Sequence, residues 1–114
     1  MLEEIHACVA RRESFAFETT LSGLVYLRHI REWRRTGWHI SLFFLSLPTQ
    51  EMAIARVAER VRQGGHGIAE AIVRRRFIAG WRNFTQYYRG EVDSWALYDN
   101  AHEEPILIEW GETP

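Results

Sequence analysis

Apolar side chains recur along the chain with two different periods, and together these periods predict alternating helices and strands. A spacing of three or four positions, which predicts amphipathic helices, occurs in residues 2–12, 21–35, 49–63 and 69–89. Short apolar runs, which predict strands, occur in residues 15–18, 38–47, 94–98 and 106–110. This order of elements is typical of an α/β fold, and we expect three layers around a mainly parallel sheet.

The run Trp38–Leu47 gives the clearest strand signal in the sequence. It is almost continuously apolar, whereas a strand with one exposed face would alternate apolar and polar residues. We therefore expect a central parallel strand that is buried on both faces. Pro48 ends this strand, and Thr49 is placed to cap the helix that follows.

The stretch Ser14–Gly23 combines a short aromatic strand, Phe15–Glu18, with a carboxylate at its end and hydroxyl groups beyond it. In open α/β folds ligands bind beyond the carboxyl ends of the strands, so Glu18 and Thr20 are candidate binding residues. A plainer interpretation is that Glu18 and Thr20 only cap the predicted helix Leu21–Arg35. The stretch by itself leaves both interpretations open.

Length and composition limit the classes of protein that fit. At 114 residues the chain forms one domain, and a net charge of −1 gives no overall field for nucleic acid or an anionic membrane. The single cysteine, Cys8, rules out an internal disulfide and fits a reducing cytosol. The N-terminus lacks the pattern of a signal peptide, and no apolar run is long enough to span a bilayer. We expect a cytoplasmic protein.

The sequence contains no lysine, and all of its basic residues are arginines. A phosphate-binding loop of the form G-x-x-x-x-G-K-[ST] needs its lysine to reach the β- and γ-phosphates of a nucleotide, so this chain cannot carry that loop. Arginine still suits the clamping of phosphate oxygens, because its planar fork presents several donors.

Arg74, Arg75 and Arg76 are consecutive on a predicted helix. At about 100° per residue they span roughly 200° of the helix circumference, so they cannot all point the same way. One should face the body of the protein, where it pairs with a carboxylate or faces an anionic ligand. The glycine-rich loop that follows Arg62 would let Arg62 and Arg75 close over one site as a lid. The alternative is an ordinary solvated basic face. The histidines and Cys8 lack the spacing of a metal site.

Several segments in this order carry a specific resemblance: RRESFAFETTLSG, WHISLFFLSLPTQEMAIARVAERVRQGGHGI, RRRF and LYDN. They resemble the zeta-toxin-like P-loop kinases over residues 2–110. The resemblance implies one kinase domain fragment over residues 1–114, with an N-terminally truncated fold of P-loop NTPase kinase type. Members of that family have a further N-terminal segment, which carries the first strand, the Walker A loop and a helix with a catalytic Asp.

The resemblance also implies roles for individual residues. Glu18 and Thr20 match substrate-binding positions at a strand end, and Arg62 and Arg75 match the catalytic arginines that clamp the nucleotide phosphates. Asp99 and Asn100 match a loop near the nucleotide base. The family uses ATP and Mg²⁺ to phosphorylate a sugar hydroxyl, in its best-known members that of UDP-N-acetylglucosamine, and includes toxins of toxin–antitoxin pairs.

In the family, the missing strand lies between the equivalents of Phe15–Glu18 and Trp38–Leu47. Without it, these two edges must pair directly, take a strand from elsewhere or bind another chain. We therefore expect an isolated chain that is marginally stable or oligomeric.

Three hypotheses about function follow. The chain is part of a split kinase completed by a P-loop chain, a non-catalytic module that binds a nucleotide sugar or a protein, or a truncated gene product.

Overall fold

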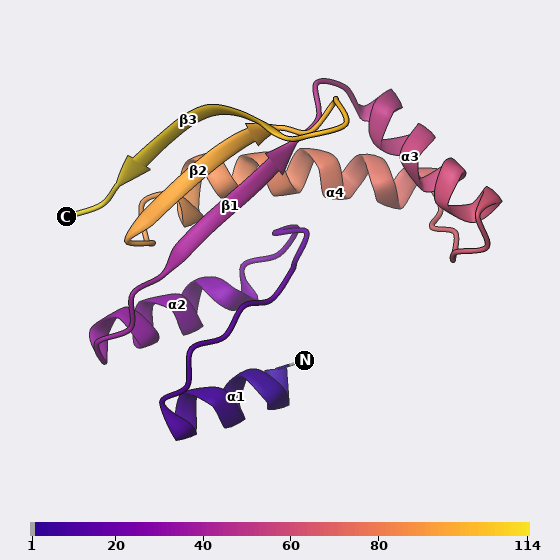
Figure 1. Ribbon diagram of the computed structural model, residues 1–114. Helices are drawn as coiled ribbons and strands as arrows, with labels where there is room; N and C mark the ends of the chain where they lie inside the picture. The colour runs from indigo at the N-terminus through magenta and orange to yellow at the C-terminus, as the bar shows by residue number, and fades with distance from the viewer. Residues whose placement is uncertain (1) are drawn as a thin grey trace.

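A computed structural model describes residues 2–114 (Figure 1). In chain order its helices are α1 (Leu2–Arg11), α2 (Val25–Arg35), α3 (Gln50–Arg62), α4 (Glu70–Asn83) and the π-helix η1 (Phe84–Tyr88), which continues α4. Its strands are β1 (Ser41–Ser46), β2 (Ser94–Asp99) and β3 (Ile106–Glu112). None of these helices combines the length and the apolar character needed to cross a membrane.

The three strands form one sheet in the order β1-β2-β3. β1 and β2 are parallel, whereas β2 and β3 are antiparallel because only a short turn joins them. The expected α/β character is correct. The expected three-layer, mainly parallel sheet of P-loop NTPase kinase type is wrong, since the described chain forms a small mixed sheet with only one parallel pair.

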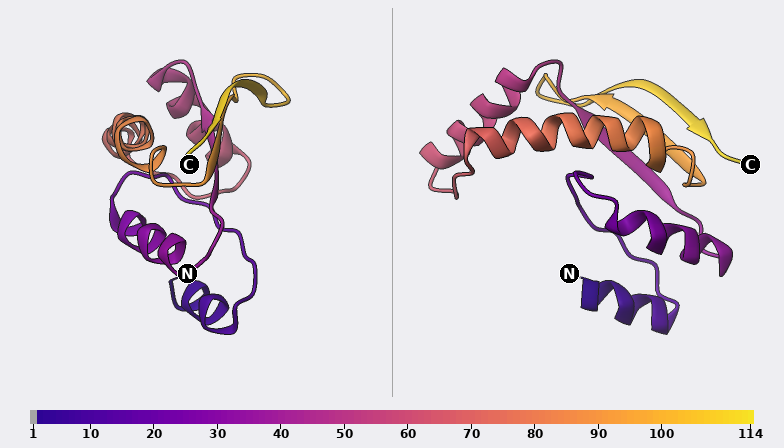
Figure 2. Two further views of the ribbon diagram at one scale, coloured as in Figure 1. Left: turned by 90° about the vertical axis from the view of Figure 1, so that its left-hand side faces the viewer. Right: turned by 180° about the vertical axis from the view of Figure 1, so that it is seen from behind.

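The core lies between one face of the sheet and the helices α2, α4 and η1 (Figures 1 and 2). Phe84, Tyr88 and Val92 are fully buried at its centre. Phe44 of β1 stacks on Phe84, with ring centroids 4.6 Å apart. The joint of α4 and η1 therefore organises the hydrophobic interior.

The prediction that residues 38–47 form a central strand buried on both faces is wrong. β1 is an edge strand, and the exposure of its side chains alternates along its length. Phe44 faces the core, while its neighbours Phe43 and Leu45 are 65% and 52% exposed. Sequence composition alone could not reveal that the second face of this apolar strand is left uncovered.

The helix ends follow local chemistry at some positions and tertiary structure at others. The Thr49 hydroxyl accepts a hydrogen bond from the Met52 N–H at 3.2 Å, which confirms the predicted cap of α3. The start of α2 is Val25 and not Leu21, because Leu21 has a φ of +54°, which no α-helix accepts. Glu18 and Thr20 therefore do not cap α2, so the interpretation of these two residues as helix caps is wrong.

The predicted strand Phe15–Glu18 does not form. Residues 14–18 run as an elongated segment (Figure 1) and make no backbone hydrogen bond to any residue of the described chain. Phe15 and Phe17 still pack against the core beside Trp33. The aromatic side chains are thus packed against the core, as expected for a strand, but the backbone has no neighbouring strand with which to pair. Direct pairing of this segment with β1 is excluded.

Candidate functional site

The loop Thr19–Gly23 is fastened to α4 and η1. The Asn83 side-chain amide donates to the Leu21 carbonyl at 2.7 Å, and the Tyr88 hydroxyl donates to the Gly23 carbonyl at 2.8 Å. At Gly80 the helix passes so close to the loop that an added Cβ would lie 2.7 Å from the Thr20 carbonyl oxygen. Three contacts over one stretch of helix therefore fix the path of the loop.

Two uncommon backbone conformations meet at this attachment. Leu21 is buried yet has a positive φ, a conformation that costs energy for a residue other than glycine. On the helix side, η1 is a π-helix, a form that is rare and is frequent at functional sites. Local deviations of this kind cluster where a structure positions side chains for binding, which makes the loop a candidate site.

The polar side chains of the loop lie on its solvent side. The hydroxyls of Thr20 and Ser22 are 2.8 Å apart, and the Thr19 hydroxyl accepts a hydrogen bond from the Leu21 N–H at 3.3 Å. Glu18 and Thr20 are both exposed. The loop thus presents several hydroxyls from a backbone that is held in place, and the carboxylate of Glu18 directly precedes it.

Tyr88 joins the loop to the start of α2. Burial raises the pKa of its phenol, and backbone groups of Tyr26 and Leu27 oppose that rise in part. Because the phenol stays protonated over a wide pH range, it can donate steadily to the Gly23 carbonyl.

The arginines of α3 and α4 divide into paired and free groups. Arg74 bonds to Gln50 at 3.1 Å and forms ion pairs with Glu51 and Glu70, at 3.4 and 2.9 Å. The hydrogen bond that Arg74 donates to the Glu70 carboxylate raises the pKa of Arg74. Sequence analysis left two alternatives for an arginine that faces the body of the protein, a carboxylate partner or an anionic ligand. Arg74 has carboxylate partners.

Arg62 is paired with Glu59 on its own helix, and both side chains are largely exposed. Arg75 is exposed, and its side chain forms no hydrogen bond or ion pair within residues 2–114. Its guanidinium is therefore available to an anion. In the described part of the chain, no hydrogen bond or ion pair links the side chains of Arg62 and Arg75 to each other or to the Thr19–Gly23 loop.

Asp99 and Asn100 lie where the two parallel strands end. The Asn100 N–H donates to the Ser46 carbonyl at 2.8 Å, so the ends of β1 and β2 meet there. The Asp99 carboxylate accepts the Ala101 N–H at 2.9 Å and lies 3.9 Å from His102. The predicted base-binding pair is therefore at the edge of the sheet where α/β folds bind ligands.

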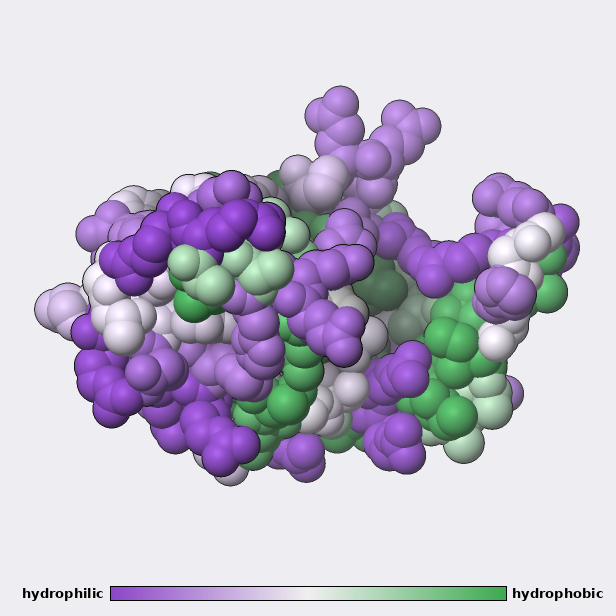
Figure 3. Space-filling model, turned by 90° about the horizontal axis from the view of Figure 1, so that it is seen from below, coloured by the Kyte–Doolittle hydropathy of each residue, from purple (hydrophilic) through white to green (hydrophobic). Residues whose placement is uncertain are grey.

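Seen from below, the surface is hollowed between the main body and the lobe that contains α3 (Figure 3). The start of α4, with its three arginines, connects these two parts (Figure 1). The predicted site residues thus come from a loop, a strand end and a projecting pair of helices, and they are not yet assembled into one pocket.

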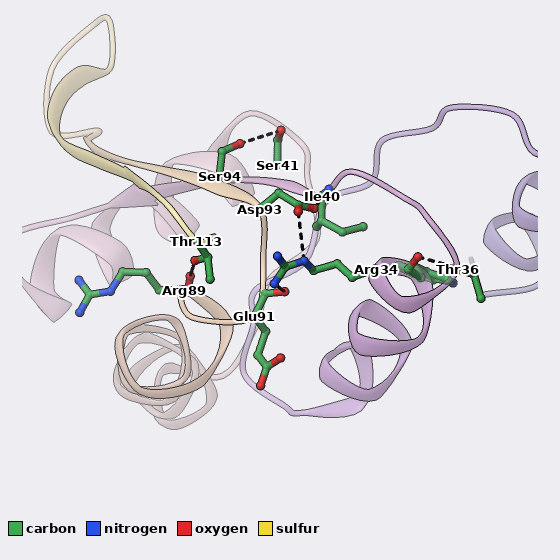
Figure 4. A network of polar contacts seen from close by, with 10 residues as sticks. Arg34, Thr36, Ile40, Ser41, Arg89, Glu91, Asp93, Ser94 and Thr113 are labelled. Carbon is green, nitrogen blue, oxygen red and sulfur yellow. Dashed lines mark hydrogen bonds and ion pairs between the residues drawn. The ribbon is translucent and has the colours of Figure 1, made fainter.

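Sequence analysis missed a polar network that fastens α2 to the sheet (Figure 4). The Arg34 guanidinium bonds to the Asp93 carboxylate at 3.1 Å and to the Glu91 carbonyl at 3.2 Å. The other Asp93 oxygen accepts the Ile40 N–H at 2.6 Å, just before β1. No local pattern could have predicted this network, because 59 residues separate Arg34 from Asp93. Its role is structural.

The residues present do not make a magnesium site. Among residues 2–114 no group of three or more His, Cys, Asp or Glu side chains is arranged to hold a metal ion. For the nucleotide, Arg75 suits a phosphate oxygen, but no lysine exists to reach the β- and γ-phosphates.

Comparison with known proteins gives one informative match. An uncharacterized protein of Haemophilus influenzae is 32% identical over 72 residues, which are 63% of this chain and 51% of the relative. The chain therefore spans about half the length of the curated relative that it matches. No protein-family model matches the chain, and no solved structure is significantly similar to it. The resemblance to zeta-toxin-like kinases remains a prediction.

Proposed function

We propose that this chain is the substrate-side and lid part of a zeta-toxin-like kinase, which phosphorylates a sugar nucleotide such as UDP-N-acetylglucosamine when another chain completes it. The observation that carries the proposal is the attachment of the Thr19–Gly23 loop to α4 and η1 through Asn83, Tyr88 and Gly80. The loop belongs to the segment that resembles the substrate side of those kinases.

A fixed backbone with exposed polar side chains is what a substrate-binding segment requires, because binding then costs little ordering of the protein. In this proposal Glu18 and Thr20 bond to hydroxyl or amide groups of the sugar. The cost of the left-handed conformation at Leu21 fits such a role, since strain is kept where it positions functional groups.

The arginines supply charge to the phosphates. Phosphoryl transfer depends mainly on positioning and on stabilisation of charge, so Arg62 and Arg75 are proposed to clamp the nucleotide from the lid. Arg62 would have to leave Glu59, which is inexpensive because an exposed ion pair contributes at most about 1 kcal/mol. Asp99 and Asn100 are proposed to contact the base.

The phosphate-binding lysine, the magnesium ligands and the general base are assigned to a complementing chain, since the residues here do not provide them. ATP and Mg²⁺ are therefore cofactors of the completed enzyme in this proposal, and the single chain should not turn over ATP. The lone Cys8 fits a cytoplasmic location.

Titration calorimetry with UDP-N-acetylglucosamine, then with ATP and Mg²⁺, tests the proposal. We expect the sugar nucleotide to bind and Glu18→Gln to weaken that binding about tenfold, the effect of losing one charged hydrogen bond. The matched control Glu112→Gln changes another exposed carboxylate, which pairs with Ser94 at the end of the sheet opposite Asp99, and it should leave binding unchanged. Absence of sugar-nucleotide binding, or equal effects of the two substitutions, would contradict the proposal.

In the completed enzyme, Arg62→Ala or Arg75→Ala should mainly lower the rate of phosphoryl transfer, while Glu18→Gln should mainly raise the KM for the sugar nucleotide. Unchanged kinetics in all three variants would contradict the roles proposed for Arg62, Arg75 and Glu18.

The second candidate is a module that binds a nucleotide sugar without catalysis, and the absence of every lysine favours it. Addition of a P-loop chain encoded beside this one separates the two candidates. Phosphorylation of the bound sugar supports the split kinase, whereas binding that stays unproductive supports the module.

A further inference from the structure

The open face of the sheet, which α4 and η1 do not cover, carries aromatic side chains around a hollow. Phe43, Tyr98 and Trp110 come from β1, β2 and β3 respectively, and all three line a hollow of about 260 Å³. The rings of Phe43 and Tyr98 have their centroids 6.4 Å apart. Phe43 and Trp110 are largely exposed. One aromatic side chain from each strand therefore borders the same accessible space.

The register of the strands sets the dimensions of this hollow. Phe43, Ala96 and Trp110 lie opposite one another across the three strands, so small Ala96 is the floor and the two aromatic residues are walls. The walls rise from backbones two strand spacings apart, which is about 10 Å. A group held midway would lie about 5 Å from each wall, within the distance of about 6 Å over which a cation is attracted to an aromatic face. Tyr98, two residues beyond Ala96, closes one end.

The charge around the hollow is negative. The 14 basic residues of the chain all precede residue 90, and the acidic residues after it are Glu91, Asp93, Asp99, Glu103, Glu104, Glu109 and Glu112. Glu91 and Asp93 pair with arginines, whereas no arginine pairs with the remaining acids in the described part of the chain. Glu112 lies opposite Ser94, two residues before Ala96, and so shares the face of the hollow. This field favours a positively charged ligand.

The polar groups of the hollow narrow the kind of cation. The hydroxyls of Ser41 and Ser94, at the end opposite Tyr98, are 3.0 Å apart and bond to each other (Figure 4). A primary ammonium or a guanidinium has several N–H donors that need acceptors, whereas a trimethylammonium group has none. A flat ring stacked between two walls needs a gap of only about 7–8 Å, since carbon atoms touch at 3.5–4.0 Å. The rounded trimethylammonium group fits the wider gap better.

We propose that this hollow binds the trimethylammonium group of a small molecule of the size of choline. Trp110, Phe43 and Tyr98 hold the cation by cation–π contacts, for which an indole is the best of the aromatic rings. Glu112 supplies the opposite charge. The volume of about 260 Å³ lies below the range of about 300–1,000 Å³ that is usual for drug-sized ligands, so a group of a few atoms is the right size.

This site is separate from the proposed function. It uses none of the residues assigned to the sugar nucleotide or to the phosphates, and it requires no nucleotide and no catalysis. Failure of sugar-nucleotide binding in calorimetry would therefore contradict the proposed function and leave the trimethylammonium site standing, and the reverse also holds.

The test is an NMR titration of the full chain with choline, followed at the Trp110 indole N–H and the Ala96 backbone N–H. We expect both signals to shift and to saturate. The control ligand is 3,3-dimethylbutan-1-ol, which has the shape of choline without its charge, and it should bind about tenfold more weakly. Equal binding of the two ligands would overturn the proposal, because the hollow would then be merely apolar. Absence of a saturable shift with choline would also overturn it.

Substitutions separate the aromatic contacts from the charge. Trp110→Leu keeps an apolar wall but removes the indole, and it should weaken choline binding about fivefold while leaving the uncharged alcohol unaffected. Glu112→Gln should weaken choline binding about threefold. Its matched control is Glu109→Gln, on the same strand but opposite Leu97 and so on the other face, which should have no effect. Unchanged choline affinity in Trp110→Leu, or equal effects of the two glutamate substitutions, would contradict the proposed contacts.

Two further measurements identify what occupies the hollow. A short peptide that carries trimethyllysine presents the same cation on a protein. Weaker binding of this peptide than of choline supports a small molecule, and tighter binding would overturn that assignment in favour of a protein. A Trp110 signal that shifts with the concentration of the chain alone would overturn the proposal in favour of self-association across the open face.

Discussion

The two faces of the sheet carry similar apolar side chains, but helices bury one face and leave the other exposed. On the covered face, Phe44 stacks on Phe84 beside Trp95. On the open face, the adjacent Phe43 and the β3 residue Trp110 are each 65% exposed. Phe43 and Phe44 are neighbours in the same strand, so their different burial reflects the helices, which cover only one face of the sheet.

The open face is more than a set of scattered apolar residues. Phe43, Tyr98 and Trp110 surround a shallow hollow of about 260 Å³ above Ala96. Contiguous apolar patches of this kind are uncommon on monomeric proteins and mark interaction surfaces. Within the described residues, this chain covers one face of its sheet and leaves the other face and the outer edge of β1 uncovered.

The largest effect should come from the covered face. Phe84 is fully buried and contacts Phe44, Trp81 and Trp95. Phe84→Ala should lower the free energy of unfolding by about 3–5 kcal/mol, because it opens a cavity at the centre of the core. Urea denaturation followed by fluorescence measures this. A loss below 1 kcal/mol would mean that the covered face is not the stabilising half of the molecule.

The next effect tests the attachment of the candidate site. Gly80→Ala places a Cβ 2.7 Å from the Thr20 carbonyl, so the loop or the helix must shift, at a cost of about 1–3 kcal/mol. Gly90→Ala is the matched control, since nothing lies within 4 Å of its added Cβ. Urea denaturation should separate the two variants, and sugar-nucleotide affinity should fall only in Gly80→Ala. Equal stabilities would show that the loop is not held against α4.

A smaller effect depends on pH. The pKa of Tyr88 is raised by burial in the folded chain, so its contribution to stability is complete below the unfolded value of about 10. That contribution is lost as the pH rises from there through the folded pKa. Tyr88→Phe should cost about 0.5–1.5 kcal/mol at neutral pH and should flatten the loss of stability above pH 10.

The matched control for this measurement is Tyr87→Phe, which removes an exposed phenol of the same π-helix. Its stability should follow that of the unsubstituted chain at every pH. If Tyr87→Phe and Tyr88→Phe gave the same pH profile, the Tyr88 hydroxyl would have no special role in fixing Gly23.

The smallest effect belongs to the open face. Phe43→Ser should change the stability of the isolated chain by no more than about 0.5 kcal/mol, as is usual for an exposed position. The same substitution at Phe44 should be strongly destabilising. The difference between the two losses of unfolding free energy measures how much more the covered face contributes to stability than the open face. A large loss at Phe43 would show that something already covers the open face.

Local chemistry predicted the elements that depend on neighbours in sequence. The apolar spacing of α1 and α3 and the Thr49 cap involve residues only a few positions apart, and these predictions are confirmed. The stretches that became β2 and β3 were also predicted to within two residues. These signals suffice because a helix bonds within itself, and because turn residues mark the ends of a short strand.

The wrong predictions all concern relations between distant segments. A strand over Phe15–Glu18 requires a neighbouring strand, and burial on both faces of β1 requires a second covering layer, neither of which sequence periodicity reports. Leu21 has a positive φ, and its carbonyl accepts a hydrogen bond from Asn83, which is 62 residues away. For the candidate site, the residue types of Glu18, Thr20 and Arg75 could be chosen from the sequence, but the contacts that hold their backbone could not.

Residue-resolved amide exchange of the isolated chain along β1 tests most directly whether the outer edge of this strand is unpaired. We expect alternation, with slow exchange at the N–H groups of Leu42, Phe44 and Ser46, which face β2, and fast exchange at those of Phe43 and Leu45, which face the outer edge of the sheet. Uniformly slow exchange along β1 at low protein concentration would contradict it, because the outer edge would then already have a partner within the chain.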